Sequence, residues 1–264
     1  MPITVAVTGA SGKMTQEVIT AVTRDRDLHL VGAISRSMAE THLPLPGGQH
    51  APVAGDIGAL LNTVKPDVLV DFTNAAWAMP ALRTAIAAGV RPVIGTSGIT
   101  GADIAELRDL CAKHRVGGVF AANFALGAVV GMHLAAVAAR YFDAAEIIEM
   151  HHDQKADAPS GTAIATAQLM AKARGRPFDN PEVKRETLGH PRAASLDGIV
   201  LHSMRLPGAL AHQEVVFGAL GQTLHIRHNA LSRECYMPGV IIAIKHVMQR
   251  EGLVVGLESV LGLA

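Results

Sequence analysis

Short apolar runs alternate with segments of helical periodicity through the first half of the chain. The apolar runs predict buried strands at Ile3–Thr8, Leu28–Ile34, Val68–Phe72, Val93–Gly95 and Gly118–Ala121. The segments between them predict helices at Lys13–Thr23, Ala75–Ala88 and Ala102–His114. Alternation of strands and helices indicates a parallel sheet with right-handed crossovers. We therefore expect a doubly wound, Rossmann-like α/β domain in this half.

The pattern changes after residue 122. A long apolar helix at Leu126–Phe142 and a strand at Ala145–His151 come first, followed by a helix at Gly161–Arg174 that Gly175 should end. Residues 175–197 are rich in Pro, Gly and charge and read as a long loop. Three strand-like runs without intervening helices then follow, at Ile199–Arg205, Gln213–Gly218 and Thr223–His228. This half therefore predicts a second, α+β domain built on a mostly antiparallel sheet.

The last predicted helix, Met237–Gln249, can return to the first domain. We therefore divide the chain into residues 1–122 plus 233–264 and residues 123–232. A length of 264 residues and a hydrophobic content of 49% suffice for two cores. Lys and Arg together number 23, as do Asp and Glu. This balance gives no reason to expect binding to nucleic acid or to an anionic membrane.

Residues 116–139 contain no charged side chain and are long enough to cross a bilayer. The segment is nevertheless interrupted by four glycines, and a buried strand, a turn at Ala122-Asn123 and a helix account for it better. The N-terminus enters an apolar strand without a basic region or cleavage site. Cys111 and Cys235 fit no metal or redox spacing. We expect a cytoplasmic protein with two free thiols.

A glycine-bearing turn, Gly9-Ala10-Ser11-Gly12-Lys13-Met14, joins the first predicted strand to the first predicted helix. Glycines let a backbone approach a pyrophosphate, and the helix N-terminus offers it free N–H groups. The spacing is GxxG, not the full GxGxxG, so a simple tight turn remains an alternative. The position directly after a strand favours dinucleotide binding.

The second strand ends at Ser35-Arg36, where NAD-binding folds usually carry an acidic residue for the ribose hydroxyls. Ser35 does not repel a 2′-phosphate, and Arg36 can bind one through a bidentate contact. Lys13 could add a second positive charge. We predict that NADPH is preferred and that NADH can also be used. The alternative is that Arg36 is an ordinary solvated side chain.

The most informative segment runs from Glu149 to Ala163. His151 and His152 end a strand, Lys155 follows, and a Pro-Ser-Gly-Thr turn opens a helix. Ser160 is suited to cap this helix, and the N–H groups of Gly161-Thr162 can bind an anion. A proton donor, a fixed cation and a carboxylate cradle suit hydride reduction of a small carboxylated substrate.

Two other interpretations of this segment were weighed. His151, His152 and Asp153 could suggest zinc, but neighbours on a strand point to opposite faces and no third ligand stands at a usual spacing. We expect no metal. The segment could also be a histidine-bearing turn with an ordinary capped helix and no chemistry.

Residues 151–162 resemble the signature of the dihydrodipicolinate reductase family at every fixed position. Other pieces match that family in the same order: Asp71-Phe72-Thr73, Gly95-Thr96-Ser97-Gly98, Ala122-Asn123-Phe124, Gly127, Ala211-His212-Gln213-Glu214-Val215, His228, Ser232-Arg233 and Pro238-Gly239. The resemblance covers essentially the whole chain. It implies reduction of 4-hydroxy-tetrahydrodipicolinate to tetrahydrodipicolinate with NADH or NADPH, in lysine and diaminopimelate biosynthesis.

The resemblance also implies roles for individual residues. His151 would donate the proton and Lys155 would assist it. The substrate, a small dicarboxylate cyclic imine, would be held in the second domain by His152, Ser160, Gly161 and Thr162. The cofactor would be bound in the first domain by Gly9, Ala10, Ser11, Gly12, Lys13, Met14, Ser35, Arg36, Phe72, Gly95, Thr96, Ser97, Ala121, Ala122, Asn123 and Phe124.

Members of the family assemble as homotetramers through the sheet of the second domain. In this chain, apolar residues stand at alternate positions of the last strand runs: Val215, Phe217, Leu224 and Ile226. One face of such a sheet can pack on the domain's own helices, and the other needs water or a neighbour. The resemblance therefore implies a homotetramer.

The chain departs from the family at Thr15, where a glycine is usual, at Ser97, where threonine is usual, and at Gln222, often Glu. None of these touches His151 or Lys155. One alternative is a related imino- or amino-acid reductase, such as an amine dehydrogenase. A non-catalytic dinucleotide sensor is another, although it would have no need of His151 and Lys155 together.

Overall fold

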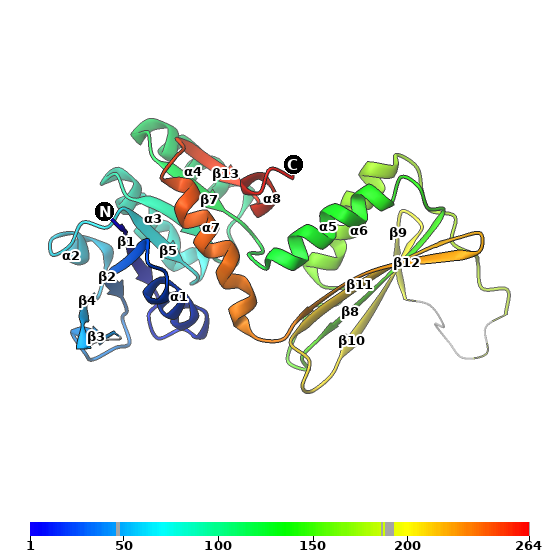
Figure 1. The fold of residues 1–264 in the computed structure, drawn as a ribbon, viewed down its shortest axis with the longest axis horizontal. Helices are drawn as coiled ribbons and strands as arrows, with labels where there is room; N and C mark the ends of the chain where they lie inside the picture. The colour runs from blue at the N-terminus through cyan, green and yellow to red at the C-terminus, as the bar shows by residue number, and fades with distance from the viewer. Residues whose placement is uncertain (46–47, 186, 188–192, 264) are drawn as a thin grey trace. The chain divides into compact units, whose positions relative to one another are not determined.

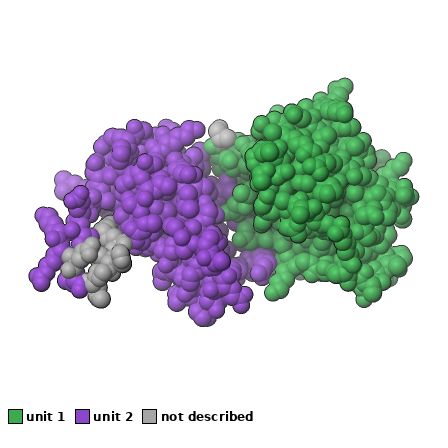
Figure 2. Space-filling model, turned by 180° about the vertical axis from the view of Figure 1, so that it is seen from behind, with its two compact units in different colours: residues 1–124, 236–264 green, residues 125–235 purple. Residues whose placement is uncertain are grey.

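The computed structural model describes residues 1–45, 48–185, 187 and 193–263. The chain forms two compact units, residues 1–124 with 236–264 and residues 125–235, which Figure 2 draws in different colours. The first observed boundary lies after residue 124, compared with 122 from the sequence. The second lies after residue 235, compared with 232.

Unit 1 contains an eight-stranded sheet in the order β13-β7-β6-β5-β1-β2-β4-β3. Every adjacent pair is parallel except β3–β4. From β1 the chain goes first to β2 on one side, and later to β5 on the other. The expected doubly wound fold is therefore confirmed, with its topological switch between β1 and β5 (Figure 1). The strands are β1 (Ile3–Thr8), β2 (Leu28–Ile34), β3 (His42–Pro44), β4 (His50–Ala54), β5 (Val68–Asp71), β6 (Arg91–Ile94), β7 (Gly117–Phe120) and β13 (Gly252–Val255).

Helices cover this sheet and complete the core of unit 1. They are α1 (Lys13–Arg24), α2 (Ile57–Leu61), α3 (Ala75–Ala87), α4 (Gly101–His114), α7 (Met237–Val247) and α8 (Leu257–Val260). Helix α1 packs against α7, and α3 packs against α4. Consecutive residues of β1, such as Val5 and Ala6, are both fully buried. Burial of both strand faces explains why these strands read as continuous apolar runs.

Unit 2 contains a five-stranded sheet in the order β12-β11-β8-β10-β9, with two helices packed on one face. Its core includes Ile147, Val215 and Phe217, together with Met170 of α6. The mostly antiparallel sheet expected from the sequence is confirmed, but the pair β8–β10 is parallel. The elements are α5 (Leu126–Ala138), β8 (Ala144–His151), α6 (Gly161–Arg174), β9 (Ala194–Leu196), β10 (Ile199–Arg205), β11 (Ala211–Ala219) and β12 (Gln222–Ala230).

Some expectations were wrong in detail. The predicted loop at 175–197 contains β9, which pairs antiparallel with β10, while residues 186 and 188–192 lie outside the described residues. The helix expected at Leu126–Phe142 ends at Ala138. The five elements β3, β4, α2, β13 and α8, each of five residues or fewer, were not predicted. In the described part of the chain, no helix is long and apolar enough to span a membrane.

Candidate active site

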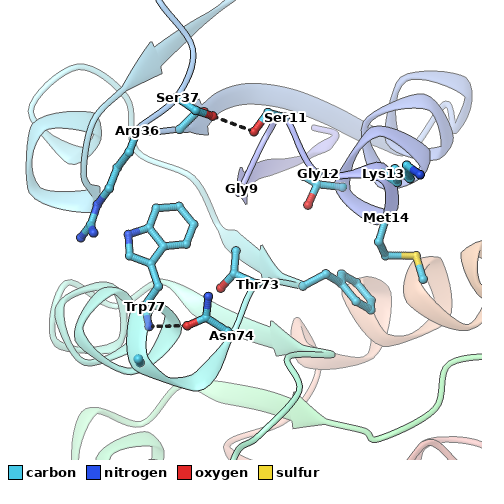
Figure 3. A pocket seen from close by; sticks show the side chains of 14 residues that line it. Gly9, Ser11, Gly12, Lys13, Met14, Arg36, Ser37, Thr73, Asn74 and Trp77 are labelled. Atoms are coloured by element: carbon cyan, nitrogen blue, oxygen red, sulfur yellow. Dashed lines mark hydrogen bonds between the residues drawn. The ribbon is translucent and has the colours of Figure 1, made fainter. Parts of the chain in front are cut away.

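A cavity of about 590 Å³ opens in unit 1 beside the carboxyl ends of β1 and β5, at the topological switch (Figure 3). Ligands of open α/β sheets bind at this place, because loops diverge there and leave a crevice. No acidic side chain is among the residues that line the cavity. These are Gly9, Ser11, Gly12, Lys13, Met14, Thr15, Ser35, Arg36, Ser37, Phe72, Thr73, Asn74, Ala76 and Trp77.

The glycine loop is shaped for close approach of a ligand. Gly9 has a φ of +69°, and a Cβ there would lie 2.7 Å from Cγ2 of Thr73. Gly12 caps α1 without a side-chain hydrogen bond, and the first turn of α1 holds no acidic residue. The first N–H groups of a helix have no acceptor within the helix. This end of the cavity therefore fits a pyrophosphate, as a nicotinamide dinucleotide requires.

A buried carboxylate positions the loops around this cavity. Asp71 is fully buried and accepts hydrogen bonds from the Thr8 hydroxyl at 2.5 Å and from the Thr73 hydroxyl at 2.7 Å. Thr96, which follows β6, also donates its hydroxyl to Asp71. These bonds connect the ends of β1, β5 and β6, and they place Thr73 in the wall of the cavity.

Hydroxyl groups and the guanidinium of Arg36 line another part of the cavity. The Ser11 and Ser37 hydroxyl oxygens lie 2.9 Å apart, and the guanidinium of Arg36 lies 5.4 Å from the ring centroid of Trp77. Ser11, Ser35 and Arg36 are site residues predicted from the sequence, whereas six other lining residues are not: Thr15, Ser37, Thr73, Asn74, Ala76 and Trp77. The only sequence signal for them was the position of residues 73–77 directly after a strand.

Half of the cofactor residues expected from the family resemblance lie elsewhere. The side chain of Ala10 is fully buried, because it faces the core, so only its backbone could meet a ligand. Residues 95–97 and 121–124 follow β6 and β7 and do not line this cavity. Phe72 lines the cavity, and its ring packs edge-on against Phe124 with centroids 5.4 Å apart. It therefore connects the cavity to the residues that follow β7.

A second constellation lies at the end of β8 in unit 2. Glu149 is fully buried and accepts several hydrogen bonds. His151 Nδ1 lies 2.5 Å from its Oε2, and Arg205 donates Nη1 to Oε2 at 2.8 Å and Nη2 to Oε1 at 2.9 Å. The backbone N–H of Ser160 donates to Oε1 at 3.1 Å. One carboxylate therefore joins β8, β10 and the start of α6.

The electrostatics of this network define the protonation of His151. Burial acts to raise the pKa of Glu149, but hydrogen bonds from Arg205 and His151 outweigh it, and the pKa lies below its usual value. An ionised carboxylate can only accept hydrogen bonds, so His151 carries its proton on Nδ1 and leaves Nε2 free. Burial lowers the pKa of His151, and Glu149 only partly offsets this. The imidazole is therefore neutral at neutral pH.

The cationic and anion-binding groups expected in this segment lie close by. Lys155 Nζ lies 2.7 Å from Asp157 Oδ1, and its side chain is 23% exposed. Arg205 also donates to the backbone carbonyl of Asp157, which holds this loop against β10. The hydroxyl of Ser160 caps α6 by accepting from the Ala163 N–H at 3.2 Å. The first turn of α6 contains no acidic residue, so its positive end remains available to an anion.

Other groups take a smaller part. His152 lies just beyond the end of β8, and no hydrogen bond of its ring is recorded within the described ranges. Arg205 Nε and Gln213 Oε1 are buried polar atoms without a partner among the described residues. Burial raises the pKa of the Cys111 thiol to about 11, so that thiol is not a nucleophile at neutral pH. The described chain shows no cluster of three or more His, Cys, Asp or Glu that could hold a metal ion.

Comparisons with known proteins give the same family for both units. Residues 3–124 match the family model described as dihydrodipicolinate reductase, N-terminus, and residues 127–261 match the model for its C-terminus. The 4-hydroxy-tetrahydrodipicolinate reductase of Dehalococcoides mccartyi (strain ATCC BAA-2266 / KCTC 15142 / 195) is 50% identical over 263 residues, which cover 99% of each chain.

Two solved structures resemble the fold. The dipicolinate-bound dihydrodipicolinate reductase from Paenisporosarcina sp. TG-14 is 40% identical and has a TM-score of 0.88, covering 98% of this chain and 99% of that one. An amine dehydrogenase from Mycobacterium smegmatis has a TM-score of 0.66 at 16% identity, and the match covers 96% of this chain and 95% of that one. At that identity the second likeness extends to the fold alone.

The pKa values of Glu149 and His151 predict how stability depends on pH. Both lie below their usual values, so the stability that each contributes is present at high pH and is lost as pH falls. For His151 the loss begins near its ordinary value of 6.5, and for Glu149 near 4.5. Melting temperatures measured from about pH 8 downward should therefore decline in two stages.

The variant His151→Gln isolates the first stage. Its melting temperature should fall less than that of the wild type between about pH 7 and pH 5. Part of the decline should remain, because burial also lowers the pKa of His228 and His246. An identical fall in the variant and the wild type would show that His151 is not held neutral in the folded protein.

Proposed function

The chain belongs to the dihydrodipicolinate reductase family of NAD(P)H-dependent oxidoreductases, and from this premise we propose that it reduces 4-hydroxy-tetrahydrodipicolinate to tetrahydrodipicolinate in lysine and diaminopimelate biosynthesis. One observation carries the proposal. His151 is held by the buried carboxylate of Glu149, with Lys155 and the open N-terminus of α6 in the same segment.

Proton delivery is the chemistry that this segment supports. The product lacks the 4-hydroxyl group of the substrate, so that group has to leave as water. The double bond that its loss creates needs a hydride at one carbon, which the cofactor would supply when bound, and a proton at the neighbouring carbon. His151 Nε2 delivers that proton, while Nδ1 stays bonded to Glu149. The imidazole is neutral in the free site, but two substrate carboxylates nearby favour its protonated form. Lys155 stabilises negative charge that develops on the substrate.

Anion binding explains the rest of the segment. The N–H groups of Gly161 and Thr162, at the positive end of α6, suit a substrate carboxylate. Ser160 keeps this turn in place by capping the helix, and His152 offers a further donor. Gly161 is exposed, and an added Cβ there would meet no atom within 4 Å, so a ligand has room. A relative solved with dipicolinate bound supports a planar dicarboxylate as the ligand.

We further propose that NADPH is preferred to NADH. Ser35 stands where an acidic residue would repel a 2′-phosphate, and it is 5% exposed. Arg36 and Lys13 line the same cavity, and both carry positive charge. NADH can still bind, because binding of the pyrophosphate at the start of α1 does not require a phosphate at the 2′ position of the adenosine ribose.

The likeness to an amine dehydrogenase raises a second candidate, an imino- or amino-acid reductase on the same scaffold. Lys155 and the backbone N–H groups of Gly161 and Thr162 argue against it, because they fit a ligand with two carboxylates. A non-catalytic sensor would not need a neutral histidine paired with a buried carboxylate. Oxidation of NADPH with and without the cyclic imine distinguishes these candidates.

Substitution of the proposed catalytic pair tests the assignment. His151→Gln and Lys155→Ala should each lower kcat for imine reduction by about 10²-fold or more. Thr162→Val is the matched control for binding: it keeps the backbone N–H but removes the hydroxyl at the proposed carboxylate site, and it should raise KM for the imine more than it lowers kcat. Full activity in both His151→Gln and Lys155→Ala would refute the proposed roles.

Cofactor preference is tested by kcat/KM for NADPH and NADH at saturating imine. The wild type should favour NADPH by about tenfold, since an exposed charge-assisted contact lies at the low end of its usual range. Arg36→Ala should lose most of that ratio while its kcat with NADH changes little. A wild-type preference for NADH, or an unchanged ratio in Arg36→Ala, would contradict this assignment.

We also propose that the sheet of unit 2 forms a homotetramer interface. Val215, Phe217 and Ile226 pack toward the helices of their own unit. The alternate positions Ile148 and Val216 lie on the opposite face, where no helix of unit 2 packs. Light scattering at micromolar concentration should therefore give about four times the mass of one chain. A monomer would be the contrary result.

A further inference from the structure

Trp77 is the only tryptophan of the chain, and it stands in the wall of the unit 1 cavity. It lies in the first turn of α3, where the side-chain oxygen of Asn74 accepts a hydrogen bond from its backbone N–H at 3.2 Å. Its ring approaches the glycine loop, since a Cβ on Gly9 would lie 3.7 Å from its Cζ3 atom. The capped helix therefore fixes where the indole stands (Figure 3).

The guanidinium of Arg36 lies against this ring. Its side chain is exposed, and no acidic residue is among the fourteen that line the cavity. The contact recorded for its guanidinium in the described chain is with the Trp77 ring, 5.4 Å from the centroid. A cation over an indole face is attracted by the ring's electron density, and tryptophan is the strongest such partner. A long side chain that is otherwise free is thereby restricted to one side of the cavity.

Two hydroxyl groups line the same cavity as the guanidinium. Ser37 follows Arg36 directly, and its hydroxyl lies 2.9 Å from that of Ser11. Both serines are exposed and line the cavity. Hydroxyls that bond to one another can turn to donate to phosphate oxygens instead. With Arg36 they provide donors from three side chains, in a place without acidic residues.

We propose that Trp77 is the positioning residue of the adenosine 2′-phosphate subsite: its cation–π contact holds Arg36 so that the guanidinium, with Ser37 and Ser11, faces that phosphate. This rests on the proposed preference for NADPH and goes beyond it, because it makes selectivity depend on an aromatic side chain that need not touch the phosphate. Trp77 should therefore affect binding of nucleotides that carry a 2′-phosphate more than binding of those that lack one.

The single tryptophan reports directly on its own subsite. Adenosine 2′,5′-bisphosphate and adenosine 5′-monophosphate differ only in the 2′-phosphate, and neither contains nicotinamide. Titration of the wild-type protein with each should change the fluorescence of Trp77, and the bisphosphate should bind about tenfold more tightly. If the wild type binds both equally, the NADPH preference and the role of Trp77 both fail.

Variants separate the role of Trp77 from the cofactor preference itself. Calorimetric titration of Trp77→Leu should show the bisphosphate bound about two- to fivefold more weakly, with the monophosphate little changed. Trp77→Phe, which keeps an aromatic face, should retain most of the wild-type ratio. In the background of Arg36→Ala, Trp77→Leu should have no further effect on the ratio, because the residue it positions is gone.

Two results would overturn the proposal while leaving the NADPH preference intact. In one, Trp77→Leu binds both nucleotides more weakly by the same factor, as expected if the indole only stacks on adenine. In the other, Trp77→Leu keeps the wild-type ratio, as expected if Arg36 needs no support. Melting temperatures of all variants show whether a loss of binding reflects a loss of fold.

Discussion

The candidate active site of unit 2 depends on one buried ion pair. Glu149 is fully buried, and an isolated carboxylate in that position would cost several kcal/mol. Two donors of Arg205, the imidazole of His151 and the N–H of Ser160 offset that cost together. These donors come from β8, from β10 and from the start of α6, so the network that keeps the carboxylate ionised also connects these three elements and orients the ring of His151.

Unit 1 uses the same physical device at its own site. Asp71 is fully buried at the end of β5 and binds hydroxyls from Thr8, Thr73 and Thr96, which follow or end three strands. In both units, a carboxylate at the carboxyl end of a central strand holds neighbouring loops around a place for an anionic ligand. The positive charge needed there comes from helix N-termini and from Arg36, Lys13 and Lys155.

Much of this arrangement could be predicted from the sequence, and the remainder shows where prediction fails. The bounds of α6 were predicted correctly, because Ser160 and Gly175 are strong capping signals. His151 and Lys155 stood out because they lie within one short segment. Arg205 was missed, since it is 56 residues from Glu149 and meets it only through the parallel pairing of β8 with β10. Trp77 was missed for a similar reason, because no local pattern connects it to Arg36.

The central claim is that Glu149 fixes the tautomer of His151. Nitrogen-15 chemical shifts of the His151 ring test it most directly, measured near pH 8 in protein labelled at histidine. We expect a protonated Nδ1 and a bare Nε2, since an ionised carboxylate 2.5 Å from Nδ1 can only accept a hydrogen bond. A ring protonated at Nε2 alone would contradict this assignment, because His151 would then have no proton on Nδ1 to donate to Glu149.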